Sequence, residues 1–325
     1  MVKIALDAMG GDHAPAEIVK GAVLASQKLG AEVILVGDPA KIKKELAKLK
    51  ADLPIVPASE VIEMNEHPAQ AVKQKKDASV NVAVNLVKEG AADAIVSAGN
   101  TGALMAAALF KLGRIEGIER PAIATEFPLP SGNVLLLDMG ANVDCKPKHL
   151  EQFAIMGSLY AKHVLHINNP RVGLLNIGEE QEKGNELVRE AWPLIKNSPV
   201  NFIGNVESKE IMEGRADVIV CDGFVGNLIL KFAESLASSV FKMFKEEISK
   251  GLLSKLGVAL LMPALLKLRK KVTHDEYGGA PLLGVGGIVY KAHGRSKSRA
   301  IKNAIKQAVE AVNGDMLSKM GAKTT

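Results

Sequence analysis

The sequence predicts an α/β protein with helices on both faces of a central sheet, a doubly wound α/β/α sandwich. Two patterns in its 325 residues favour this fold. Short apolar segments alternate with amphipathic helical segments along the whole chain. Polar motifs rich in Gly, Asn and Asp follow several apolar segments, and open α/β sheets bind ligands at such strand ends. We expect a single domain over residues 1–325, with one cleft at the carboxyl ends of its strands.

The first half of the chain predicts six strands and the helices between them. The strands are expected at 2–6, 33–36, 54–57, 94–96, 122–127 and 134–137. Pro15 fits the first turn of a helix, and Asp38 before Pro39 fits a helix N-cap. Ser79 is expected to cap the helix that precedes the fourth strand. A Gly-rich turn at 97–103 then leads into a helix rich in Ala and Leu.

The second half continues the alternation and adds a protruding hairpin. Strands are expected at 172–176, 202–203, 218–221 and 283–290, and helices at about 147–164 and 296–320. A helix over 226–249 has apolar residues every three to four positions. After it, apolar residues alternate with the six basic residues of segment 250–271, which has no acid. We therefore expect a helical hairpin at about 226–272.

Two partners for this hairpin stay open. Its longest uncharged stretch, 256–266, has eleven residues and contains Pro263, too few for the roughly 20 that span a bilayer. Its cations would attract an anionic membrane surface. Alternatively, its apolar face would pack against a second copy of the chain. A dimeric bundle with a basic, apolar tip satisfies both interpretations.

Composition argues against several functional classes. Aromatic residues are only 4% of the chain, which disfavours a base-stacking nucleic-acid surface. The net charge of +5 is smaller than the six cations of 250–271, so the basic character is local. Cys145 and Cys221 form no disulfide framework, and residues 1–7 begin as a strand without a signal-peptide pattern, so a cytoplasmic location is expected. Asp7, Asp12 and His13 lack a second ligand cluster, so we expect no metal and no cofactor.

The turn at 97–103 is the strongest candidate for an anion site. Unpaired N–H groups and the helix dipole make a helix start attractive to phosphate. Its two glycines allow a ligand to approach the backbone, and its polar side chains add hydrogen bonds. The substrate-binding candidates here are Ser97, Gly99, Asn100, Thr101 and Gly102.

The motif at 138–147 and later strand ends supply catalytic candidates. Asp138 and Asn142 either act in catalysis or bind their own turn. Cys145 would need a base and a lowered pKa to act as a nucleophile. Lys183 would neutralise phosphate or an oxyanion, unless it is simply solvated. Asp222 and His293 complete the catalytic set, and His293 equally fits a helix cap.

The remaining substrate-binding candidates are single polar residues near strand ends or helix starts. Each is ambiguous alone, and their common placement is the evidence. They are Asp7, Lys76, Asn205, Glu207 and Asn227.

Together these motifs resemble the bacterial acyl-acyl-carrier-protein:phosphate acyltransferase family, from the first strand to the last helix. The motifs that carry the resemblance are those at 7–15, 97–103, 138–147, 183–185, 204–207, 222–227 and 277–281. Two positions depart from the family pattern. Arg295 stands where Ser is common, and Lys73 stands where Arg is common.

The resemblance implies that a long-chain fatty acyl group moves from acyl carrier protein to inorganic phosphate. The acyl phosphate would feed a membrane glycerol-3-phosphate acyltransferase in phospholipid synthesis. It also implies a Rossmann-like fold similar to phosphate acetyltransferases and isocitrate dehydrogenases, a homodimer, and peripheral attachment to the inner face of the cell membrane. The alternatives are a short-chain, coenzyme A-dependent phosphate acetyltransferase and a non-catalytic membrane scaffold for lipid enzymes.

Within that reaction, we expect phosphate to bind at the 97–102 turn, with Lys183 and Lys76 offsetting its charge. Asn100, Thr101 or Asn142 would donate to the oxyanion. Asp138, Asp222 or His293 would position groups or handle a proton, and an apolar groove toward the hairpin would take the acyl chain.

Overall fold

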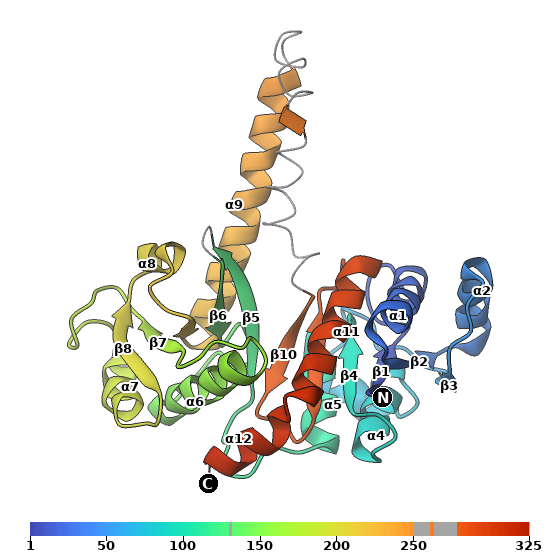
Figure 1. Cartoon of the computed structure of the whole chain (residues 1–325), viewed down its shortest axis with the longest axis horizontal. Helices are drawn as coiled ribbons and strands as arrows, with labels where there is room; N and C mark the ends of the chain where they lie inside the picture. Colours follow the sequence, from blue (N-terminus) through green and yellow to red (C-terminus); the bar gives the residue numbers. More distant parts are fainter. Residues whose placement is uncertain (130–131, 250–260, 263–277, 325) are drawn as a thin grey trace.

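The computed structural model describes residues 1–129, 132–249, 261–262 and 278–324, and it confirms the α/β sandwich. Within these ranges, eleven strands form one sheet in the order β3-β2-β1-β4-β11-β10-β5-β6-β9-β7-β8 (Figure 1). The sheet therefore runs through the whole molecule, and its central strands β10 and β5 connect an N-terminal half to a half built around β6.

The strands have the following bounds: β1 Lys3–Asp7, β2 Glu32–Gly37, β3 Ile55–Pro57, β4 Ala94–Ser97, β5 Ala122–Leu129, β6 Gly132–Leu137, β7 Arg171–Leu175, β8 Asn201–Val206, β9 Val218–Val220, β10 Gly279–Leu283 and β11 Ile288–Ala292. The helices are α1 Ala16–Leu29, α2 Pro39–Leu49, α3 Pro68–Gln74, α4 Ser79–Lys88, α5 Thr101–Lys111, α6 Pro147–His163, α7 Glu186–Lys196, α8 Ser208–Glu213, α9 Gly223–Ser249, α11 Ser298–Asn313 and α12 Met316–Thr324.

Strand direction reverses across the centre of the sheet. The strands β1, β2, β3, β4 and β11 are parallel. Next, β10 is antiparallel to both β11 and β5, and β5 is antiparallel to β6. The strands β6, β9, β7 and β8 are again parallel to one another. The carboxyl ends of these four strands therefore lie at the opposite edge of the sheet from those of β1, β4 and β11.

Two apolar cores fill the two faces of the sheet. One core joins Leu6 and Leu137 to side chains of α1, α6 and α11, with Phe153 among them. The other core joins Ala5 and Leu136 to side chains of α4 and α5. Ala5 and Leu136 directly precede Leu6 and Leu137 in the sequence. Because successive strand residues point to opposite faces, each strand contributes to both cores. The apolar runs of the sequence are therefore typical of strands covered on both sides.

The chain differs from the expected elements near its C-terminus. The expected strand at 283–290 is instead two strands, because Gly284 has a φ of 88° and the following glycines complete a turn. A Cβ atom at Gly286 would lie 2.5 Å from the carbonyl oxygen of Leu112, so this turn packs against the end of α5. The expected final helix is also two helices, with Asp315 at a φ of 51° between them.

Two helix starts also differ. Ser79 is the first residue of α4, and Ala78 holds the N-cap position. The helix expected from residue 226 begins at Gly223, because the carboxylate of Asp222 accepts from the backbone N–H groups of Phe224 and Val225. Asp222 thus stabilises the start of α9.

The first arm of the expected hairpin is α9, which projects beyond the layers of the sandwich (Figure 1). Its Gly223–Phe244 segment is long and apolar enough to cross a membrane by length and composition alone. Such a helix equally fits contact with another protein. Most of the second arm, including the basic residues of 250–271 and most of the apolar stretch at 256–266, lies outside the described residues.

Candidate functional site

A cleft of about 560 Å³ lies over the middle of the sheet, between the start of α5 and the first turns of α9. Thr101 borders it from α5 and Asn227 from α9. Its floor includes alternate residues of the central strands, with Ile123 and Thr125 from β5 and Lys291 from β11. His293 and Arg295 close one side. Three of the predicted site residues, Thr101, Asn227 and His293, therefore share one cleft.

Asp7 and Ser97 form a buried pair behind this cleft. Asp7 is 2% exposed, and the Ser97 hydroxyl donates to its carboxylate at 2.6 Å. The N–H of Gly99 in turn donates to the Ser97 oxygen at 3.0 Å. Burial raises the pKa of Asp7 above its usual range, although hydrogen bonds oppose the shift. These hydrogen bonds therefore fix the backbone of the turn at 97–99 from its buried side.

The glycines of the turn accommodate protein neighbours. A Cβ atom at Gly99 would lie 3.3 Å from a carboxylate oxygen of Asp7, and one at Gly102 would lie 2.5 Å from Pro68. Likewise, a Cβ atom at Gly10 would lie 2.7 Å from the amide nitrogen of Gly99. We expected these glycines to admit a ligand, but they let two turns and α3 pack closely.

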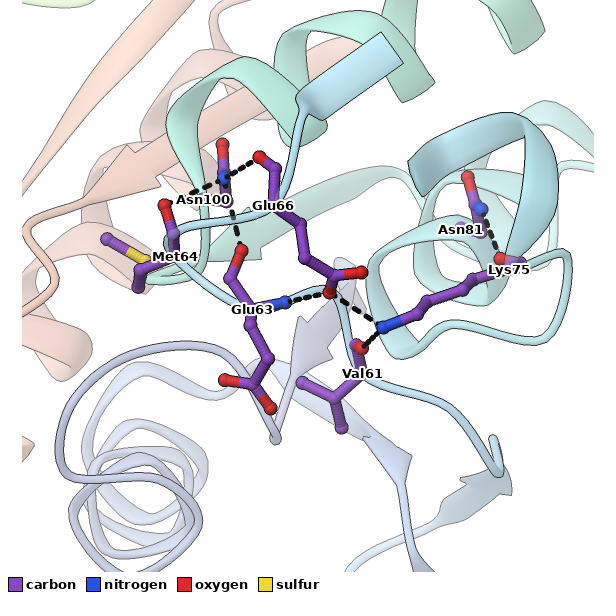
Figure 2. A network of polar contacts seen from close by, with 7 residues as sticks. All are labelled: Val61, Glu63, Met64, Glu66, Lys75, Asn81 and Asn100. Carbon is purple, nitrogen blue, oxygen red and sulfur yellow. Dashed lines mark hydrogen bonds and ion pairs between the residues drawn. The ribbon is translucent and has the colours of Figure 1, made fainter. Parts of the chain in front are cut away.

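Asn100 braces the wall of the cleft (Figure 2). Its side-chain oxygen caps α5 through the N–H of Ala103, and its amide group donates to carbonyls of the 63–66 loop. That loop carries Met64, which lines the cleft. Glu66, the last residue of this loop, forms an ion pair of 2.6 Å with Lys75 and so fixes the loop. Asn100 therefore positions the loop, and its amide is not available to an oxyanion.

Asp138 and Asn142 form a second closed bracket. Asp138 is fully buried, and its carboxylate accepts from the backbone N–H groups of Ile123, Gly140, Ala141 and Asn142. The Asn142 amide donates to Asp138 at 2.8 Å and to the Pro121 carbonyl at 2.7 Å, which uses both of its hydrogens. The expected oxyanion donor Asn142 is thus already occupied, and the pair instead holds Gly140 at the cleft.

Lys291 is the cleft residue that the sequence did not reveal. It lies beside Ser97 in the strand register, and its ammonium group donates to the carbonyl of Ala98 at 3.5 Å. Burial lowers its pKa to about 8, while Asp7 and Asp12 oppose this shift. At neutral pH it therefore places a positive charge at the candidate anion turn. A lysine at the end of an apolar run, two residues before His293, was the available signal.

Glu126 is a second cleft residue outside the prediction. It lies on β5 and accepts hydrogen bonds from Gln307 at 2.7 Å and Asn133 at 3.2 Å. Burial raises the pKa of its carboxyl group. Next to the cleft opening, His293 is exposed, and its Nδ1 accepts from the N–H of Arg295.

The other predicted residues do not reach this cleft. Asp222 and Glu207 line a separate pocket of about 600 Å³, to which α9 contributes Val225 and Ile229. Asn205 lies within β8, is buried and donates to the Glu180 carbonyl, while Lys183 is exposed beside Gly184 of that pocket. The expectation of a single cleft was wrong, because the start of α9 separates the two hollows: Val225 and Ile229 line the pocket, whereas Asn227 and Leu230 line the cleft.

Lys76 is exposed and does not line the cleft either. Cys145 is unsuited to nucleophilic chemistry, since burial raises the pKa of its thiol to about 12. Among the described residues, no group of His, Cys, Asp and Glu side chains could hold a metal ion. What the cleft offers is Lys291, a helix start and Thr101 for an anion, with apolar Met64, Ile123 and Leu230 beside them.

The chain is similar to known proteins in both sequence and fold. The sequence pattern of the family described as fatty acid synthesis proteins matches residues 2–319. The chain is 56% identical to a phosphate acyltransferase from Moorella thermoacetica and 55% identical to one from Desulfitobacterium hafniense. These matches cover 98% of this chain, and 95% and 96% of the two relatives. Its fold is similar to a phosphotransacetylase from Streptococcus pyogenes, with a TM-score of 0.66, 19% identity, and coverage of 96% of this chain and 94% of that one.

Proposed function

Because the chain belongs to the family of fatty acid synthesis proteins and is a phosphate acyltransferase, we propose that its central cleft moves a long-chain acyl group from acyl carrier protein to inorganic phosphate. The product would be an acyl phosphate for phospholipid synthesis. A family role in fatty acid synthesis is consistent with acyl carrier protein as the donor.

The chemistry needs no covalent enzyme intermediate. An oxygen of HPO₄²⁻ attacks the thioester carbonyl, the C–S bond breaks, and the phosphate proton ends on the departing thiol. The protein must hold the anion against the carbonyl and offset the charge that develops on its oxygen. Asp138 and Asn142 act by fixing the turn around Gly140, and not by touching the reacting atoms.

The observation that carries this proposal is the ammonium group of Lys291 at the Ala98 carbonyl, beside the start of α5. A lysine and a helix N-terminus together favour a phosphate guest. Thr101 adds a hydroxyl at the same position, and the apolar side of the cleft leads toward α9 for the acyl chain. Lys291 thus takes the role that we first assigned to Lys183 and Lys76.

The test measures acyl phosphate formation, trapped as hydroxamate, from palmitoyl carrier protein or acetyl-coenzyme A. The long-chain donor should be used at least about tenfold more efficiently, a difference of 1.4 kcal/mol. With this donor, Lys291→Met should raise KM for phosphate by roughly 10- to 100-fold, the cost of one hydrogen bond to a charged group. Lys43→Met, at an exposed position on α2, is the control.

Each alternative predicts a different result. Preference for acetyl-coenzyme A would favour a short-chain enzyme. Absence of thioester-dependent phosphate consumption would favour a scaffold. An unchanged KM for phosphate in Lys291→Met would remove Lys291 from the phosphate site.

We also infer homodimer formation and peripheral attachment to the inner face of the cell membrane, both through α9. Support comes from an apolar stripe along α9 whose members are 47–67% exposed. The stripe consists of Phe224, Leu228, Phe232, Leu236, Val240, Met243 and Phe244. Exposed apolar surface of this extent is typical of an interaction site. A cytoplasmic enzyme attached in this way would release acyl phosphate close to a membrane glycerol-3-phosphate acyltransferase.

A further inference from the structure

A basic pocket of about 480 Å³ lies between the last turn of α5 and the start of α6, and the proposed function leaves it unused. Its cations are Arg114, Arg120 and Lys146, and we call it the basic pocket. Glu119 is the one carboxylate that lines it. The three cations therefore outnumber the acid, and an anion is the favoured guest.

Glu119, the carboxylate of the basic pocket, already accepts a hydrogen bond from within the protein. Nδ1 of His149 accepts from the N–H of Lys146, so its Nε2 carries the hydrogen and donates to Glu119 at 3.0 Å. His149 is 5% exposed, and burial lowers its pKa, which keeps the ring neutral. Elsewhere in the described part of the chain, no carboxylate lies within ion-pair distance of Arg120 or Lys146. Both cations are thus available to a ligand.

The basic pocket adjoins the cleft along two elements. Pro121, directly before β5, lines the pocket, and Ile123, the second residue of β5, lines the cleft. On α5, Thr101 borders the cleft and Leu109 borders the pocket. Eight residues of helix separate those two, which is about 12 Å. A single extended molecule could therefore occupy both hollows.

The proposed acyl donor has this shape and charge. Carrier proteins hold acyl groups as thioesters on a phosphopantetheine arm, with a phosphodiester at the end nearest the protein. The arm contains two amide units and is comparable to four or five extended residues, about 14–18 Å. With the thioester at the cleft, its phosphodiester would lie near the basic pocket.

We propose that the basic pocket binds the phosphodiester of the donor's phosphopantetheine arm and so places the thioester in the cleft. The inference rests on the proposed function. The start of α6, directly after Lys146, adds the positive end of a 17-residue helix to the pocket. Arg120 and Lys146 are positioning residues in this proposal, since they hold the donor far from the reacting carbonyl.

The first experiment compares the wild-type chain with the double variant Arg120→Gln/Lys146→Gln. The control Lys43→Gln/Lys44→Gln removes the same charge from α2, at the outer edge of the molecule (Figure 1). In the basic-pocket variant, KM for palmitoyl carrier protein should rise on the order of tenfold, the effect of about 1.4 kcal/mol. KM for inorganic phosphate and kcat should stay within twofold of wild type, as both should in the control.

The second experiment identifies which anion the pocket binds. Wild-type enzyme should prefer palmitoyl phosphopantetheine to palmitoyl pantetheine, which lacks the phosphate, and the double variant should lose this preference. Equal use of the two donors by wild type would overturn the proposal, and so would a raised KM for inorganic phosphate. If the double variant unfolds, as judged by circular dichroism, Arg120→Gln alone takes its place. If wild type forms no acyl phosphate from any donor, the proposed function itself fails.

Discussion

At the scale of single residues, polar side chains in this protein fall into two groups that the sequence does not separate. Asp138, Asn142 and Asn100 form hydrogen bonds with nearby backbone groups and so hold turns in place. Thr101 and Lys291 are directed at the cleft instead. Asp, Asn and Thr suit turns and binding sites equally, because both need short polar side chains near strand ends.

Lys291 gives a pH-dependent prediction. Its pKa of about 8 in the folded protein is below the roughly 10.4 of an unfolded lysine. Between these values the unfolded chain binds more protons, so this residue adds stability as pH rises through the window. Below pH 8 the cost of its buried charge is fully present.

Lys291→Met removes that cost. Without phosphate, the variant should therefore have a higher Tm than wild type at pH 7, and the gain should shrink toward pH 10. Paired thermal unfolding curves at pH 7, 8, 9 and 10 measure it, with Lys43→Met as the control. A lower Tm at pH 7, or a gain that stays constant with pH, would contradict the prediction.

At the scale of elements, amphipathic periodicity predicted the helices well but not what covers them. The apolar positions of α1 and α11 are buried in the sandwich, whereas those of α9 remain exposed. The apolar periodicity is the same in all three helices, because it indicates that a helix has an apolar face and does not indicate what that face packs against. Glycine turns were also difficult to predict. Residues 283–290 have the composition of one apolar strand, but in the structure the left-handed φ of Gly284 divides them into two strands.

The stripe on α9 carries a prediction about association. Phe232→Glu/Leu236→Glu places two carboxylates in the middle of the stripe, where each would lose apolar contact and repel anionic lipid. The variant should form less dimer, and a smaller fraction of it should bind vesicles of anionic lipid. Acyl phosphate formation in solution should persist. Light scattering and vesicle flotation measure the two effects.

Lys242→Glu, outside the stripe on the same helix, is the control. Unchanged mass and unchanged flotation of Phe232→Glu/Leu236→Glu would show that the stripe serves neither partner.

At the scale of the whole molecule, the alternation of strands and helices predicted the layers but not the order of the strands. Pairing of β4 with β11 joins residues far apart in the sequence, and local patterns do not encode such contacts. The position of α9 had the largest consequence for the site. Its first turns lie between the cleft, which Asn227 lines, and the pocket, which Asp222 lines, although both residues come from the same loop and helix start after β9.

The late partner of β4 also predicts how fragments behave. A chain ending at residue 278 lacks β10 and β11, so β4 and β5 become open edges. This fragment should sediment as aggregate when expressed alone. Co-expression of residues 279–325 should return a measurable soluble fraction, because it supplies both missing strands together with α11.

A soluble, monodisperse 1–278 fragment would contradict this expectation. Co-expression of an equally long segment from the N-terminal end, residues 1–47, serves as the control, since it contains neither missing strand.

The same pairing has a consequence for synthesis on the ribosome. β4 ends at Ser97 and β11 begins at Ile288, so about 190 residues must be translated before the pair can close. At 5–20 residues per second this takes roughly 10–40 s, during which one edge of the nascent sheet has no partner. Chaperones that shield nascent chains would have their longest task in this interval, and slow codons placed between these strands would lengthen it.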